Sequence, residues 1–275
     1  KGRWMSSFHG LWSVGAFFAA LLGGLVANFV SPMVNLVVIS TLSFLAYFWV
    51  NYNLLPPHLD GHLGDEGEEL ESKVPLKGKE AMILWGLGFG LMCALIPEGG
   101  AYDWSGILLQ DHMDIGKGLN AAAATIFSLA MIASRLLGDR FFEKWGHVKT
   151  VQYGGFFGGG IWGLSLMIGI PLADSHQMAS LVIVCIGFGA AGFGMGPFFP
   201  AFNLAAASIP GVAPSVGLAR IGLIAIGSYF AGPTIIGGIA EVTSLPIAFA
   251  FPVLLMFGAA YQSRFITVKR LSHEN

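Results

Sequence analysis

Two carboxylates and a tryptophan lie together in EGGAYDWS, residues 98–105, directly after the almost entirely apolar run 81–97. Glu98 and Asp103 supply the carboxylates, and Trp104 supplies the aromatic ring. An ionisable side chain beside an apolar helix interior is kept mainly where it faces a cavity, a partner or an ion path. Burial would favour the protonated carboxyl group, which suits proton exchange. Glu98 is therefore the first candidate for chemistry in this chain.

The elements that carry this motif are predicted to cross a membrane. The chain has 275 residues, of which 55% are hydrophobic and 11% are charged, whereas soluble proteins carry about 25% charged residues. A helix needs roughly 20 apolar residues to span a bilayer. Eight stretches meet this requirement, and the sequence predicts an all-α polytopic membrane protein with spans at about 8–30, 33–55, 81–108, 117–138, 150–172, 178–206, 215–240 and 246–266.

Charge placement predicts the orientation of these spans. With Lys1 in the cytoplasm and eight alternating spans, 13 of the 14 Lys and Arg residues fall in cytoplasmic segments or at their adjoining helix ends. Only Lys117 falls on the opposite side. Because cytoplasmic loops are enriched in Lys and Arg, both termini are expected in the cytoplasm, and EGGAYDWS is expected at the outer end of the third span.

The opening motif then has two interpretations, and both stay open. In one, Glu98 and Asp103 are solvated at the membrane boundary and Trp104 belongs to the interfacial aromatic belt. In the other, the Gly99-Gly100 pair breaks the helix, and the three side chains form the outer wall of a central cavity. Further polar candidates inside the spans are His9, Asn203 and Arg220, and each also fits a packing or interface role.

One long hydrophilic segment, residues 56–80, separates the second and third spans. Its proline, glycine and acidic residues are typical of a flexible linker. His58 and His62 lie four residues apart within it, but the neighbouring prolines and glycines argue against the helix that would align them as metal ligands. We therefore expect a linker between two helical bundles, and neither a metal site nor a cofactor.

A weak internal repeat crosses this linker. The stretches 10–19 (GLWSVGAFFA) and 222–231 (GLIAIGSYFA) share five identical residues at a constant offset of 212. Parallel repeats of this kind occur in membrane proteins built from two related halves. With a repeat of six spans, residues 81–275 form a complete C-terminal bundle. Residues 1–55 then form only the last two helices of the N-terminal bundle, and we expect the chain to be a fragment that lacks four preceding helices.

These features together resemble the major facilitator superfamily. The segment 135–149 (RLLGDRFFEKWGHVK) is similar to its cytoplasmic loop signature, although Gly146 comes later than usual and His147 stands where a basic residue is common. FHGLWSVG, residues 8–15, and EGGAYDWS are similar to stretches of a bacterial branch related to sugar permeases. The resemblance covers the whole chain, as helices five to twelve.

This resemblance implies a secondary active transporter in the bacterial inner membrane that moves a small solute by alternating access. Proton coupling is one option, and a non-transporting receptor or scaffold of the same fold is the alternative. The pathway would involve Glu98, Asp103, Trp104, Asn203 and His9. A cytoplasmic latch between the bundles would be formed by Arg135, Gly138, Asp139, Arg140 and Gly146, residues that also fit ordinary membrane anchors.

Other functional classes lack their sequence features. The spans show no convergent nucleophile and base and no metal triad, so we do not expect an enzyme. The phosphate-binding pattern G-x-x-x-x-G-K-[ST] that ATP-driven transport needs is absent from the sequence. The expected partners are the lipid bilayer and a small solute, and no nucleic acid.

Overall fold

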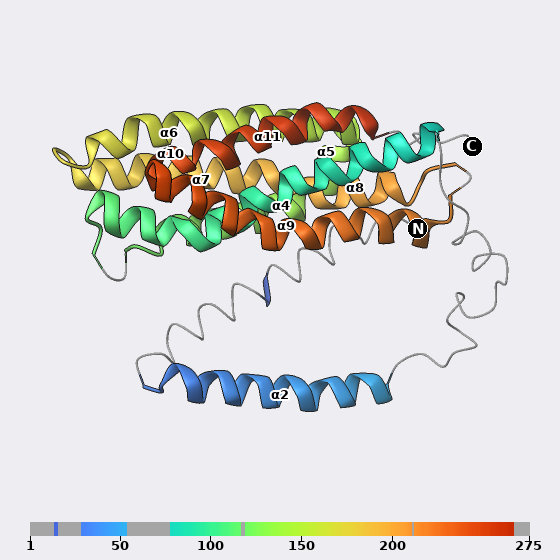
Figure 1. The fold of residues 1–275 in the computed structure, drawn as a ribbon, viewed down its shortest axis with the longest axis horizontal. Helices are drawn as coiled ribbons and strands as arrows, with labels where there is room; N and C mark the ends of the chain where they lie inside the picture. The colour runs from blue at the N-terminus through green and yellow to red at the C-terminus, as the bar shows by residue number, and fades with distance from the viewer. Residues whose placement is uncertain (1–13, 16–28, 54–77, 117–118, 211, 267–275) are drawn as a thin grey trace. The chain divides into compact units, whose positions relative to one another are not determined.

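The structure is a computed structural model that describes residues 14–15, 29–53, 78–116, 119–210 and 212–266. All regular structure in this part of the chain is helical (Figure 1). The helices are α2 (Pro32–Tyr52), α4 (Gly78–Met113), α5 (Ala122–Tyr153), the π-helical turn η2 (Gly154–Gly158), α6 (Gly159–Leu172), α7 (Gln177–Met195), α8 (Phe198–Ala206), α9 (Pro214–Val242), α10 (Leu245–Ala248), α11 (Ala250–Gln262) and the 3₁₀ turn η3 (Ser263–Phe265).

Six helical stretches of the described residues are long and apolar enough to cross a membrane. They are Met33–Tyr52, Gly78–Met113, Ala122–Leu172, Gln177–Ala206, Pro214–Val242 and Leu245–Phe265. The expectation of an all-helical membrane protein is therefore confirmed. The first predicted span, 8–30, lies almost wholly outside the described residues, so the count of eight spans stays a prediction. His9 lies outside them as well.

The longest of these stretches, Ala122–Leu172, contains a reversal at Gly146. Its 51 residues would extend about 77 Å at 1.5 Å per residue, more than twice the roughly 30 Å of a bilayer core. Gly146 has φ 75° and ψ 164°, outside the helical region. The hydroxyl group of Thr150 donates to the carbonyl oxygens of Gly146 (2.8 Å) and Phe141 (3.2 Å) across this kink. The fourth and fifth predicted spans thus meet at Gly146.

The chain divides into two compact units, of which the smaller covers Val14–Pro75. Its described helix, α2, begins at the Ser31 N-cap, whose hydroxyl oxygen accepts a hydrogen bond from the backbone amide of Val34 at 3.4 Å. The 20 residues of its membrane-length stretch have a mean hydropathy of 1.9, and none of them is buried. A helix that is apolar all round is suited to lipid or to helices of a larger bundle.

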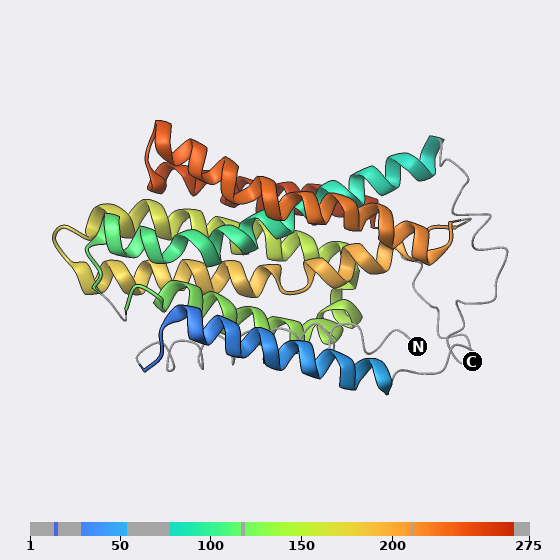
Figure 2. The ribbon, with the colours of Figure 1, turned by 60° about the horizontal axis from the view of Figure 1, so that its bottom comes forward.

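The larger unit contains the other helices named above. Within it α7 packs against α5 and α6, while α4 packs against α9 and α11. Figure 2 shows α4 (teal) beside the C-terminal helices (orange to red). At the core, Trp162 of α6, Phe188 of α7 and Phe249 before α11 are fully buried and meet edge to face, with ring centroids 5.2 to 6.0 Å apart. Aromatic pairs prefer this geometry.

Helix α4 is continuous through Gly99 and Gly100 and extends over 36 residues with Pro97 inside it. The hypothesis that the glycine pair breaks the helix is therefore wrong. A Cβ atom at Gly100 would lie only 2.8 Å from Cδ1 of Ile236 in α9, so this glycine serves close helix packing, as small residues do in membranes. The helix also begins at Gly78, inside the segment 56–80 that was predicted as linker.

Candidate functional site

A buried ion pair joins α4 to α5. Nη2 of Arg135 lies 3.4 Å from Oε1 of Glu98. Glu98 is 7% exposed and Arg135 is 4% exposed. Charged groups are costly at membrane depth and occur there mainly in paired form. Each of these two charges is therefore compensated by the other.

A second polar contact lies one helical turn further along α4. The hydroxyl of Tyr102 donates to Oγ of Ser128 in α5 at 3.4 Å. Glu98 and Tyr102 are four residues apart, and Ser128 and Arg135 are seven apart, so each pair shares a helix face. As numbering rises along α4 it falls along α5, which shows that the two helices are antiparallel here. The four side chains form a ladder of two rungs between them.

The ladder extends to an open surface of the larger unit. Tyr102 is 40% exposed, and its ring meets that of buried Phe127 edge to face at 5.4 Å. Tyr229 of α9, 53% exposed, lies within electrostatic range of Glu98, Arg135 and Tyr102. Two partly exposed phenols thus lie near the ion pair. We call Glu98, Tyr102, Ser128, Arg135 and Tyr229 the polar cluster.

The chemistry of the polar cluster is limited by its members. Arginine side chains keep their charge in proteins, whereas a carboxyl group can exchange a proton. Glu98 is therefore the member whose charge can change. When Glu98 is neutral, the Arg135 charge becomes available to a different acceptor, either on the protein or on a bound molecule.

Of the residues predicted for the pathway, the structure places only Glu98 in the polar cluster. Asp103 is exposed and lies on a different face of α4. Trp104 packs against α9, where a Cβ at Gly237 would lie 3.2 Å from its ring, and its buried Nε1 has no hydrogen-bond partner. The amide of Asn203 donates to the carbonyl oxygen of Phe199 in its own helix at 2.8 Å. A pathway role for these three stays a prediction.

The residues predicted for the latch separate into two places. Arg135 lies in the polar cluster. The other four lie further along α5, up to and including its kink: Gly138, Asp139, Arg140 and Gly146. There Gly138 is buried, Asp139 is half-buried and Arg140 is exposed. A cytoplasmic latch that includes Arg135 and these four residues stays a prediction.

Sequence reasoning missed Tyr102, Ser128 and Tyr229 and assigned Arg135 to the membrane boundary. Two features of the amino-acid sequence could have indicated these contacts between α4 and α5. Arg135 is surrounded by apolar residues in MIASRLLG, and the spacings of four on α4 and seven on α5 place all four side chains on facing stripes. Among the described residues no group of three or more His, Cys, Asp or Glu side chains could hold a metal ion.

An all-helical membrane bundle with a charged pair buried between its helices defines the class of this protein. The family model of the Major Facilitator Superfamily matches residues 1–217, and the chain belongs to this family. No solved structure matches the chain significantly.

Similar curated proteins are bacterial. The chain is 29% identical to an uncharacterized MFS-type transporter of Yersinia pestis over 96% of the chain and 64% of that protein. It is 30% identical to an uncharacterized transporter of Sinorhizobium fredii over 89% of the chain and 60% of that protein. The membrane protein MosC of Rhizobium meliloti is 27% identical over 60% of the chain and 39% of its own length. The chain thus spans roughly three fifths of the first two relatives.

Proposed function

We propose that the whole protein is a secondary active transporter that moves a small solute by alternating access and couples this movement to protons through Glu98. The observation that carries the proposal is the buried pair of Glu98 and Arg135. An ionisable residue inside a membrane bundle is a functional candidate by default. Two relatives are described as transporters, which supports the same class.

Coupling needs a group that differs between the two states of the transporter. In the state seen here, Glu98 is paired with Arg135. Protonation of Glu98 would remove its charge and weaken this pair. Arg135 would then be available to the solute or to the facing bundle, and the half-exposed phenols of Tyr102 and Tyr229 would lie on the route to it. The energy of protonation would thereby bias one state over the other.

The proposal also includes a class of solute, a division of the chain into parts, an orientation in the membrane and a latch. The resemblance of EGGAYDWS to the branch related to sugar permeases supports a small polar solute. The internal repeat supports the division into 1–55, 56–80 and 81–275, with four further helices before them. The charge distribution supports termini in the cytoplasm of a bacterium and a cytoplasmic latch at the α5 kink.

A direct test uses the full-length protein in liposomes that enclose a pH-sensitive dye. Small solutes, including sugars and sugar acids, are added outside one class at a time. The proposal expects a solute-dependent pH change inside, abolished by a protonophore. Absence of any solute-dependent flux, with or without a proton gradient, would instead favour the receptor or scaffold alternative.

A further inference from the structure

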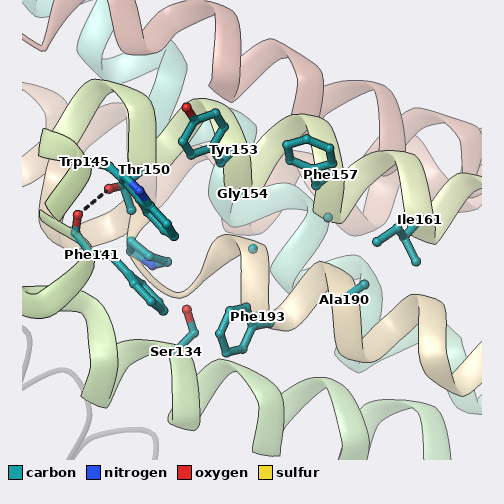
Figure 3. Close-up of a pocket in the computed structure, with 13 residues that line it drawn as sticks. Ser134, Phe141, Trp145, Thr150, Tyr153, Gly154, Phe157, Ile161, Ala190 and Phe193 are labelled. Atoms are coloured by element: carbon teal, nitrogen blue, oxygen red, sulfur yellow. Dashed lines mark hydrogen bonds between the residues drawn. The ribbon is translucent and has the colours of Figure 1, made fainter.

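An apolar groove of about 440 Å³ lies on the larger unit, and none of the five residues of the polar cluster lines it. Figure 3 shows aromatic rings around it from three directions. Its wall is formed by Ser134, Phe141, Trp145, Thr150, Tyr153, Gly154, Phe157, Gly158, Ile161, Ala190, Phe193, Gly194 and Pro197. None of these side chains carries a charge. The volume lies within the roughly 300–1,000 Å³ typical of ligand pockets.

The groove is built by the reversal at Gly146 and by a close helix contact. The reversal brings Tyr153 and Phe157 opposite Phe141 of α5. At the floor, a Cβ at Gly154 would lie within van der Waals overlap of the Gly194 carbonyl, and a Cβ at Gly194 would overlap Gly154 likewise. The π-helical turn η2 begins at this contact, and such turns often occur at functional sites.

The rim of the groove is apolar in its middle, and Lys144 lies beside it at one end. Phe157 is 66% exposed and Ile161 is 42% exposed. At the kink, Nζ of Lys144 lies 5.2 Å from the ring centroid of Trp145, which lines the groove. Lys149 and Arg140 are exposed and directly precede the lining residues Thr150 and Phe141. Against these three cations the segment 139–150 has two acids, Asp139 and Glu143.

We propose that this groove binds an anionic phospholipid, with one acyl chain along the aromatic wall and the phosphate group beside Lys144 and Lys149. The apolar wall excludes a hydrophilic solute, and the cations at its end favour a negatively charged headgroup over a neutral one. Basic sites between membrane helices recognise anionic headgroups in this way. In the predicted orientation the bound lipid belongs to the cytoplasmic leaflet.

The test uses Trp145 as a reporter in the full-length protein. The protein is reconstituted in phosphatidylcholine vesicles that contain a minor, fixed fraction of brominated lipid, either phosphatidylglycerol or phosphatidylcholine. Bromine quenches tryptophan fluorescence on contact, and subtraction of the Trp145→Phe signal isolates Trp145. We expect brominated phosphatidylglycerol to quench Trp145 at least threefold more than brominated phosphatidylcholine does at the same fraction.

Matched variants separate the headgroup site from the groove. Lys144→Gln with Lys149→Gln should remove the preference, whereas Lys79→Gln, an exposed cation on α4, should keep it. Ala190→Phe should fill the groove and lower quenching by both lipids, whereas Ile168→Phe on the exposed face of α6 should not. Equal quenching by the two lipids, or a preference that survives the double lysine variant, would overturn the proposal. Weak quenching by both lipids would also overturn it, because another part of the protein would then cover the groove.

Discussion

Glu98 and Arg135 are each buried to more than nine tenths, and Nη2 of Arg135 lies 3.4 Å from Oε1 of Glu98. Removal of one partner from a buried ion pair leaves an uncompensated charge, which costs about 3–5 kcal/mol. Removal of both charges costs far less, because the desolvation penalty disappears with them. The pair should therefore behave as one unit in any mutational experiment.

The first prediction concerns the ion pair of Glu98 and Arg135. Arg135→Gln should destabilise the protein by about 3–5 kcal/mol, and the loss should shrink as the pH falls, because protonation of Glu98 removes the unpaired charge. Glu98→Gln combined with Arg135→Gln should recover most of the stability. Thermal unfolding in detergent at several pH values measures this. Equal destabilisation by the single and double variants at every pH would contradict the coupling.

The hydrogen bond between Tyr102 and Ser128 should contribute less to the free energy of unfolding than the ion pair does. Tyr102→Phe removes the hydroxyl that donates to Ser128 at 3.4 Å, and a hydrogen bond of this kind is worth about 0.5–1.5 kcal/mol. Ser128→Ala should cost a similar amount, and the double variant should cost little more than either single one. Additive losses in the same unfolding assay would show that the two side chains do not depend on each other.

Sequence reasoning could identify Glu98 but not its partner. An acid after a long apolar run is visible in one dimension, and its cost in a membrane makes it a candidate. The depth of Arg135 depends on where α5 reverses. That position is set by a glycine conformation and by the packing of α5 against α7, which residue types alone do not determine.

Among the helices, the course of the chain depends on the backbone conformation at a few residues. Gly146 adopts φ 75° and ψ 164°, a region open almost only to glycine. The glycine belongs to the segment that resembles the family's loop signature, yet its position there is unusual. Its role in this chain is explained by the reversal within α5.

A substitution at the kink should therefore be costly. Gly146→Ala should destabilise the protein by about 1–3 kcal/mol, since the side chain makes this conformation strained. Gly160→Ala is the matched control, because Gly160 lies inside α6 and an added Cβ there would meet no atom within 4 Å. It should be neutral or slightly stabilising. Comparable loss of melting temperature in both variants would contradict the account of the kink.

The helices themselves were predictable and their breaks were not. Apolar length located the described membrane helices to within a few residues at most ends. One of the two interpretations of EGGAYDWS had the Gly99-Gly100 pair interrupt α4, but the helix is intact, and Gly100 packs closely against Ile236. Glycine in a membrane helix can serve packing or bending, and only the neighbouring helix decides between them.

For the whole molecule, the predicted membrane orientation rests on the placement of Lys and Arg. Arg135 is buried in the bundle and no longer counts as a boundary charge, which leaves 12 of the 13 remaining cations on the predicted cytoplasmic side. The asymmetry that underlies the orientation is thus almost unchanged.

Cysteine accessibility tests this orientation in intact cells. Cysteines introduced singly at Ser31, Gly116 and Ser175 should react with an impermeant thiol reagent added outside, while one at Lys144 should react only after the membrane is opened. The native Cys93 and Cys185 are buried and should add little background. Labelling at Lys144 from outside would reverse the orientation.

Proton coupling through Glu98 can be tested by comparing two transport rates in the wild-type protein and one variant. Full-length protein and its Glu98→Gln variant are reconstituted in liposomes, and two rates are measured for the transported solute: uphill uptake driven by a proton gradient, and exchange of the solute across the membrane at equal pH. Glutamine keeps the size and the hydrogen-bonding capacity of the side chain but cannot titrate. We predict that uphill uptake falls at least tenfold in the variant, while exchange stays within about threefold of wild type. A tenfold change corresponds to a loss of about 1.4 kcal/mol in the free energy of coupling. Unchanged uphill uptake with an unchanged pH dependence would contradict this prediction.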